Sequence, residues 1–294
     1  MINTLMEALD KENINVFRLV LMNRDGSFEK ADRLPTTPCH NCYSISKAIT
    51  ATAVGILQDD GRLSVEDSLE RYFDLRDYDR DSWSRVKIEH LLTHTMGIEK
   101  GCLFEADRYG IPTEDWVDWV LRQPLQYAPG EHYAYSNSTF YLLSVIVERV
   151  AGCTLLEFVR QRLFTPMGIR SYAWETCPLG HTMGATGLYL STEDLARFCR
   201  LYLCEGNWEG KHLLSEAWCA RVHAGSEGSY YGGFTSGKRG RFSVGGAYHQ
   251  FGIIAPDKGV VLAGHSFVEA DGGKYAPLRS AFLDSLPDAA GIHP

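Results

Sequence analysis

Strand-like and helix-like patterns divide this chain into three parts, and their order restricts the folds open to it. Residues 16–21 read as a strand, and so do residues 241–248, 250–255 and 260–267 near the other end. Residues 64–180 are mostly helical, with proline and glycine at the joints. The sequence therefore predicts an α/β (α+β) fold, in which one antiparallel sheet is built from both ends, flanked by helices and interrupted by an all-helical insertion.

Turn and helix signals support this order. Residues 23–26 predict a hairpin after the first strand, and residues 256–259 predict one between the last two strands. Apolar residues recur at helical spacing from 45 to 57 on nearly all faces, which indicates a buried helix ending at residues 59–61. We expect further helices over residues 4–12, 86–92, 114–121, 138–150, 154–164, 192–203 and 275–286.

The length of 294 residues is about that of two domains. The patterns assign residues 1–64 and 181–294 to a mixed α/β sheet domain. They assign residues 65–180 to a helical insertion domain.

The charge balance excludes some partners. The formal net charge is −8, whereas nucleic acids and anionic membranes are bound by basic surfaces. The apolar runs are too short to span a bilayer, and the N-terminal segment lacks the basic region of a signal peptide. We therefore expect a cytoplasmic protein that acts on a small molecule or peptide, with no nucleic-acid or membrane partner. The oligomeric state stays open.

The eight cysteines are expected to be mostly buried thiols, because the chain is long enough for a core and shows no secretion signal. Cys39 and Cys42 have the Cys-x-x-Cys spacing of a redox motif or of half a zinc site. No second Cys-x-x-Cys completes such a site. Incidental cysteines are therefore the preferred interpretation, and we expect no metal and no cofactor.

Ser-x-x-Lys occurs three times, starting at Ser27, Ser44 and Ser84, and a pattern this short arises about once by chance in such a chain. Only Ser44 opens a strongly apolar helix. Lys47 then lies almost one turn further on the same face. Burial would lower the pKa of Lys47 and let it take the hydroxyl proton of Ser44. The alternative is a helix cap followed by a surface lysine.

A second motif is Tyr135-Ser136-Asn137. The phenol of Tyr135 can pass a proton to a leaving group. The amide of Asn137 can hold a lysine and a substrate carbonyl at once. The same residues also suit an ordinary turn before a helix.

A third motif is Gly245-Gly246-Ala247, inside a predicted strand. Paired glycines in a strand indicate a bulge or a close approach of backbones. A ligand along this edge could accept a hydrogen bond from the N–H of Ala247, which with the N–H of Ser44 would form an oxyanion hole. A bulge needed only for sheet curvature is the alternative.

The order of these motifs resembles that of the serine β-lactamase and penicillin-binding-protein superfamily, and most closely its class C β-lactamase-related esterases and peptidases. The resemblance implies a β-lactamase/transpeptidase-like fold with the active site between the sheet domain and the helical domain. It extends over about residues 40 to 265. The matching stretches are YSISKAIT at 43–50, LLTHTMGI at 91–98, Pro129-Gly130 followed by Tyr135-Ser136-Asn137, and residues 187–198.

The resemblance implies a serine hydrolase that cleaves an ester or amide bond through an acyl-enzyme on Ser44, as a β-lactamase-related esterase, amidase or D-peptidase. Lys47 and Tyr135 would share the general acid–base work.

The remaining site residues would bind or orient the substrate. Asn137 would position Lys47 and the substrate, and Ala247 would supply the second oxyanion N–H beside Gly246. His249 is nearby in the sequence and is a further candidate for substrate binding. A histidine at a strand end that makes one hydrogen bond is the preferred alternative for this residue.

One departure concerns the third motif, which in the family usually begins with Lys, His or Trp, whereas this chain has Val244. Valine cannot bind a substrate carboxylate or stabilise a phenolate, which argues against β-lactam hydrolysis. Arg239 or Arg241 could supply the missing charge. A catalytically weak or inactive penicillin-binding-like protein is therefore the first alternative, and a thiol-redox or zinc protein using Cys39 and Cys42 is the second.

Overall fold

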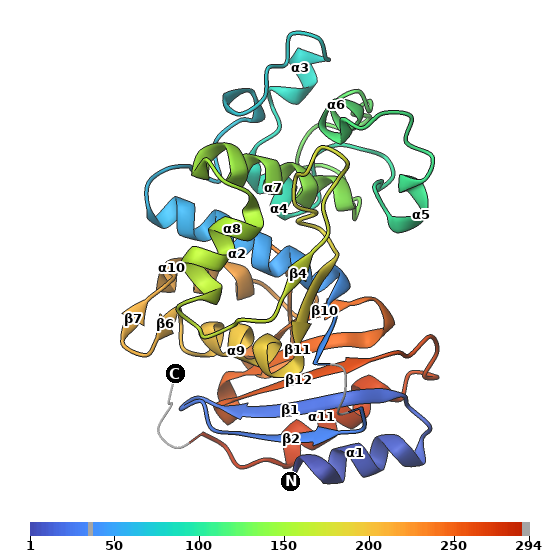
Figure 1. Ribbon diagram of the computed structural model, residues 1–294, viewed down its shortest axis with the longest axis vertical. Coiled ribbons are helices and arrows are strands. Elements are labelled where there is room, and N and C mark those ends of the chain that lie inside the picture. Colours follow the sequence, from blue (N-terminus) through green and yellow to red (C-terminus); the bar gives the residue numbers. More distant parts are fainter. Residues whose placement is uncertain (35–37, 290–294) are drawn as a thin grey trace.

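A seven-stranded antiparallel sheet forms the lower half of the molecule in a computed structural model that describes residues 1–34 and 38–289 (Figure 1). The spatial order of its strands is β2-β1-β12-β11-β10-β9-β8. Because β1 pairs with β12, the two ends of the chain share one sheet, and the predicted fold class is confirmed. The strands are β1 (Val16–Asn23), β2 (Phe28–Asp32), β8 (Tyr230–Tyr231), β9 (Phe234–Ser236), β10 (Phe242–Gly246), β11 (Gln250–Ala255) and β12 (Val260–Ser266).

Helices cover both faces of the sheet. Leu19 and Leu21 of β1 belong to a hydrophobic cluster with α1 (Ile2–Lys11) and α11 (Tyr275–Ser285). Val20 and Met22 belong to the larger cluster on the opposite face, which includes α9 (Thr192–Leu203). Successive side chains of a strand point to opposite faces, so a nearly continuous apolar run is what a strand covered on both sides requires.

The helix α2 (Ser46–Asp59) is buried from Ser46 to Leu57, as its all-round apolar pattern predicts. It packs against α7 (Asn137–Ala151). On another side, the indole of Trp218 from α10 (Glu216–His223) lies so close that a Cβ at Gly55 would be 2.5 Å from the ring. Glycine at this position lets the ring lie directly on the backbone of the helix.

The upper half of the molecule in Figure 1 consists of short helices around α7. One hydrophobic cluster nevertheless runs from these helices through α2 to α9, so the division at residues 65 and 180 stays a prediction. No helix of the described residues has the length and apolar character to cross a membrane. The short helices are α3 (Arg80–Trp83), α4 (Ile88–Leu92), α5 (Glu105–Arg108), α6 (Trp116–Leu121) and α8 (Leu155–Val159), which continues as a π-helix over Arg160–Phe164.

The structure differs from the expected elements mainly in short segments. The strand expected at 241–248 ends at Gly246, and a 3-10 turn over Ala247–His249 follows it. Ser44 lies in a 3-10 turn over Tyr43–Ile45, directly before α2 rather than inside it. Strands of two to four residues were not predicted, because they are too short to show an alternating pattern in the sequence. They are β3 (Cys39–Asn41), β4 (Ala173–Trp174), β5 (Leu188–Ser191), β6 (Asn207–Trp208), β7 (Lys211–His212), β8 and β9.

Candidate active site

Ser44 is presented by a tightly held turn. Strand β3 pairs with β5 and leads into this turn, where the N–H of Cys42 donates to the carbonyl of Leu188 at 2.7 Å. Tyr43 has a left-handed backbone, with a φ of 47°, and its N–H donates to Oδ1 of Asn41 at 2.8 Å. A left-handed conformation is costly for tyrosine and persists only where the surroundings enforce it. The turn therefore gives Ser44 a fixed direction at the start of α2.

Lys47 lies below Ser44 and is 0% exposed. Its Nζ is 3.2 Å from Oγ of Ser44, 2.7 Å from Oδ1 of Asn137 and 2.8 Å from the carbonyl oxygen of Ala185. Burial lowers the pKa of Lys47 well below its ordinary value, and the charge of Arg108 acts in the same direction. A neutral amine has two N–H bonds for the two acceptors and a lone pair for the third neighbour, Ser44.

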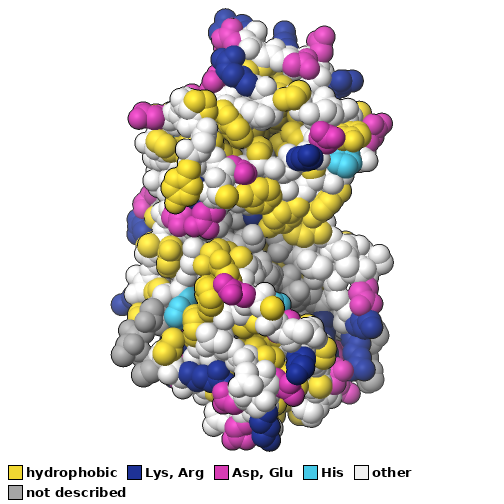
Figure 2. Space-filling view, turned by 90° about the vertical axis from the view of Figure 1, so that its right-hand side faces the viewer, with side chains coloured by type: hydrophobic (Ala, Val, Ile, Leu, Met, Phe, Trp, Pro, Cys, Tyr) yellow, Lys and Arg dark blue, Asp and Glu magenta, His cyan; other side chains and the backbone are white. Residues whose placement is uncertain are grey.

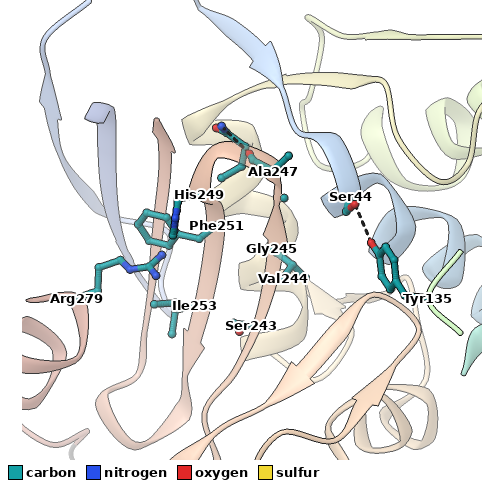
Figure 3. A pocket seen from close by; sticks show the side chains of 12 residues that line it. Ser44, Tyr135, Ser243, Val244, Gly245, Ala247, His249, Phe251, Ile253 and Arg279 are labelled. Atoms are coloured by element: carbon teal, nitrogen blue, oxygen red, sulfur yellow. Dashed lines mark hydrogen bonds between the residues drawn. The ribbon is translucent and has the colours of Figure 1, made fainter. Parts of the chain in front are cut away.

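Tyr135 reaches Ser44 from the other side of the cleft. Its hydroxyl donates to Oγ of Ser44 at 2.8 Å (Figure 3). Burial raises the pKa of Tyr135, although its hydrogen bond to Ser44 lowers it. Ser44 thus lies between a phenol whose pKa is raised and an amine whose pKa is lowered, which is an arrangement suited to moving a proton in both directions.

Asn137 stands at the first position of α7, with Ser136 as the helix cap. Its Nδ2 donates to the carbonyl of Leu103 at 3.1 Å, and its Oδ1 faces Lys47. The amide therefore has a fixed orientation, because each end meets a partner of the opposite kind.

Strand β10 closes the site next to Ser44. A Cβ at Gly246 would overlap the carbonyl oxygen of Cys42, so the close backbone approach expected there is present. Ala247 opens the following 3-10 turn, and both it and Ser44 occupy one of the first two positions of such a turn. N–H groups at these positions have no acceptor within the turn. Ser44, Gly246 and Ala247 line one pocket of about 540 Å³.

The face shown in Figure 2 is hollowed between the helical half and the sheet. Hydrophobic side chains gather on the helical side of the hollow.

His249 also lines the pocket, from the turn after Ala247. Its backbone and that of Tyr248 are left-handed, with φ values of 62° and 56°. The hydroxyl of Ser266 lies 2.9 Å from the carbonyl oxygens of both residues. The ring of Tyr248 stacks on Phe267 at 4.5 Å and meets the edge of Tyr43 at 5.3 Å. The turn after Ala247 is thus held from both sides.

Arg279 of α11 is a lining residue that sequence reasoning missed. Its guanidinium lies 4.2 Å from the ring centre of Phe251 and 4.3 Å from that of Tyr275. Its buried Nε has no hydrogen-bond partner among the described residues. Figure 3 places Arg279 with His249 across β10 and β11 from Ser44. It lies outside the motifs, and the pattern of residues 275–286 indicated only a helix.

Val244 is 1% exposed, and the two arginines considered as its replacement are engaged elsewhere. Arg241 pairs with Asp257 at 2.7 Å and with Asp284 at 2.8 Å. Arg239 pairs with Asp284 at 2.9 Å. Neither arginine lines the pocket that contains Ser44.

In the other two Ser-x-x-Lys sequences, the lysines make surface ion pairs. Lys30 pairs with Glu193 at 3.2 Å, and Lys87 pairs with Glu66 at 2.8 Å. Among the three matches, the contact between serine and lysine is found at Ser44.

Cys42 is buried, and burial raises the pKa of its thiol to about 12. Its Sγ lies 3.6 Å from Nε2 of His265, while Cys39 is partly exposed. His90 and His94 also have a spacing found in zinc sites, but both make hydrogen bonds within the protein. The described residues contain no group of three or more His, Cys, Asp or Glu side chains that could hold a metal ion.

The chain belongs to the beta-lactamase family, whose model matches residues 30–267. It is 32% identical to "Penicillin-binding protein 4*" of Bacillus subtilis (strain 168) over 142 residues, which are 46% of this chain and 30% of that protein. It is 27% identical to a D-aminopeptidase of Brucella anthropi over 161 residues, which are 52% of this chain and 30% of that protein. The chain thus spans about a third of the length of these two relatives.

The fold is that of known structures of this family. A mutant class C beta-lactamase superposes with a TM-score of 0.75 over 96% of this chain and 95% of its own, at 17% sequence identity. The predicted family resemblance and the β-lactamase/transpeptidase-like fold are therefore confirmed.

We predict that Gly246→Ala separates the end of β10 from the turn that carries Ser44, because the new Cβ would overlap the carbonyl of Cys42. The melting temperature should fall by several degrees, and labelling of Ser44 by a fluorophosphonate should slow at least about 10-fold. Gly245→Ala is the matched control for stability, since a Cβ there has only the Gln250 carbonyl oxygen at 4.0 Å. Equal melting temperatures for the two variants would contradict this account.

Proposed function

We propose that this protein is a serine hydrolase that cleaves an ester or amide bond through an acyl-enzyme on Ser44. The observation that carries the proposal is the position of the Ser44 hydroxyl between the buried amine of Lys47 and the phenol of Tyr135. Membership of the beta-lactamase family and the similarity to a D-aminopeptidase support hydrolysis as the activity. A small molecule or a peptide is the proposed substrate.

In acylation, Lys47 Nζ accepts the hydroxyl proton while Oγ of Ser44 forms a bond to the substrate carbonyl carbon. The carbonyl oxygen becomes negative, and the N–H groups of Ser44 and Ala247 stabilise it. Tyr135 then donates its phenolic proton to the leaving oxygen or nitrogen as the scissile bond breaks. The products of this step are the free leaving group and an ester on Ser44.

In deacylation, water attacks the ester and the same groups move the proton in the opposite direction. Tyr135, which lost its proton to the leaving group, regains one from Lys47 or from the attacking water. Oγ of Ser44 leaves with a proton, and the acid product departs. Ser44, Lys47 and Tyr135 return to their starting protonation states, so the cycle balances without a metal or cofactor.

The pocket suggests where a charged part of the substrate would bind. Gly245 has no side chain, so a ligand bound at Ser44 can extend across β10 towards the guanidinium of Arg279. A half-buried arginine with a buried, unpartnered Nε gains most from a carboxylate, which it can bind with two parallel hydrogen bonds. We therefore propose that Arg279 takes over the anion binding that Val244 cannot perform.

The first test is covalent labelling. A fluorophosphonate should add one adduct to the wild-type protein, located at Ser44 by peptide mass spectrometry, and Ser44→Ala should stay unlabelled. Equal labelling of the variant would refute the assignment. Binding of a penicillin or peptide without adduct or product over a broad panel of esters and amides would favour the alternative of a binding protein without turnover.

The second test separates function from stability. Lys47→Met should slow acylation by about 10²- to 10⁴-fold, because the proton acceptor is lost. The folded state lowers the pKa of Lys47, so between the two pKa values the unfolded chain binds more protons and the unfolding free energy rises with pH. In urea unfolding, the unfolding free energy of the variant should therefore depend less on pH than that of wild type. A variant whose unfolding free energy has the same pH dependence as that of wild type would contradict a lowered pKa of Lys47.

The third test concerns Arg279. Arg279→Ala should raise KM about 10-fold or more for a depsipeptide with a free terminal carboxylate and leave KM for its carboxamide nearly unchanged. Arg239→Ala is the control, because that arginine pairs with Asp284 away from the pocket. A similar rise in KM for both substrates would show that Arg279 shapes the pocket rather than binding an anion.

A further inference from the structure

We propose that the ion pair between Arg108 and Glu175 is a positioning device for Lys47, because it ties together the two segments that supply the oxygen acceptors of the Lys47 amine. This inference rests on the proposed function of Lys47 as the proton acceptor. The two residues are distant in sequence, and neither touches Ser44 in the hydrogen-bond network. Each of the two residues supports a segment that carries one of the oxygen acceptors of the Lys47 amine.

Arg108 supports the segment that fixes the side chain of Asn137. Its Nε donates to the carbonyl of Leu103 at 3.4 Å. The same carbonyl accepts the Nδ2 proton of Asn137 at 3.1 Å, and Oδ1 of Asn137 is 2.7 Å from Lys47 Nζ. Leu103 is buried and has a left-handed backbone with a φ of 61°, a conformation that surrounding contacts must maintain. Arg108 is one of those contacts.

Glu175 supports the loop that carries the Ala185 carbonyl. It follows β4, and its N–H donates to the carbonyl of Gly187 at 3.0 Å while its carbonyl accepts the N–H of Met183 at 2.8 Å. Both ends of the loop that carries the Ala185 carbonyl are therefore bonded to the backbone of Glu175. A Cβ at Gly187 would be 2.6 Å from the carboxyl group of Glu175, so glycine leaves room for that side chain.

The ion pair joins these two supports. Nη1 of Arg108 is 3.2 Å from Oε2 of Glu175, and the arginine side chain is 15% exposed while the glutamate is 41% exposed. Because the guanidinium of Arg108 is largely removed from water, its charge depends on the partner carboxylate more than the charge of an exposed arginine does. The pair thereby connects α5 with the segment between β4 and β5, and the two acceptors of Lys47 keep one relative position.

The pair also contributes a charge. The other groups facing Lys47 are neutral: the phenol of Tyr135 keeps its proton, and burial lowers the pKa of His94 to about 3, so His94 is uncharged at neutral pH. Arg108 is then the cation that opposes protonation of Lys47. Because the carboxylate of Glu175 lies beside the guanidinium of Arg108, we expect it to offset this charge in part. Removing either partner should therefore change the protonation of Lys47 in opposite directions.

The experiment measures the rate of fluorophosphonate labelling between pH 5 and 10 by intact mass. The labelling rate should rise with pH as Lys47 becomes neutral, and the midpoint of that rise is the quantity compared. Arg108→Gln should raise the midpoint by about half a pH unit or more, and Glu175→Gln should lower it by a similar amount. Arg108→Lys keeps the charge but loses the Nε–H, so it should keep the midpoint and lower the plateau rate.

A matched control is Arg122→Gln, which breaks the exposed ion pair of Arg122 with Asp118 and should leave the midpoint unchanged. Melting temperatures identify variants that fail to fold. The Lys47 resonance in protein labelled with ¹³C at lysine Cε, assigned with Lys47→Met, reports the same titration without requiring activity.

Midpoints that stay at the wild-type value in both glutamine variants, or that move in one direction in both, would overturn the role of the ion pair. A wild-type protein that the probe does not label would contradict the proposed function instead. In that case the titration of the Lys47 resonance still decides whether Arg108 and Glu175 act on Lys47 as described.

Discussion

The burial of one lysine is the constraint on which the rest of this structure depends. A lysine is almost never fully buried unless its amine has partners, and Lys47 has an amide oxygen, a backbone carbonyl and a serine hydroxyl. Those partners come from α7, from the loop before β5 and from the turn before α2. The fold must bring three distant segments to one atom, and the apolar surface of α2 is what removes water from it.

The side of the pocket formed by β10 and the turn before α2 depends on a different kind of contact. There the essential feature is the absence of side chains, because β10 can approach the carbonyl of Cys42 only at Gly246. The left-handed residues Tyr43 and Tyr248 flank the two N–H groups, and their rings touch. The local strain at each turn is thus shared between a strand of the sheet and the segment that carries the nucleophile.

The sequence predicted those side chains of the candidate site that lie in motifs or in long periodic elements. Ser44, Lys47, Tyr135 and Asn137 could be chosen because a hydroxyl, an amine, a phenol and an amide have distinct chemistry. The backbone carbonyls of Leu103 and Ala185 could not be chosen from the sequence, because every residue has a carbonyl. Only the folded path of the chain determines which carbonyls lie next to Asn137 and Lys47. Arg279 was missed for a related reason, because a helical pattern does not tell which arginine lacks an acidic partner.

The pairing of β1 with β12 has a consequence for how the protein is made. The first strand leaves the ribosome long before its partner exists, so the sheet cannot close until nearly the whole chain has been synthesised. The helices α2 and α7, which pack against each other, are both complete before β10, β11 and β12 are made. Ser44 is then among the first residues of the candidate site to be made, and Ala247 joins it only when the end of β10 has been synthesised. In the proposed mechanism, an incomplete chain therefore lacks the second N–H group that would stabilise the oxyanion.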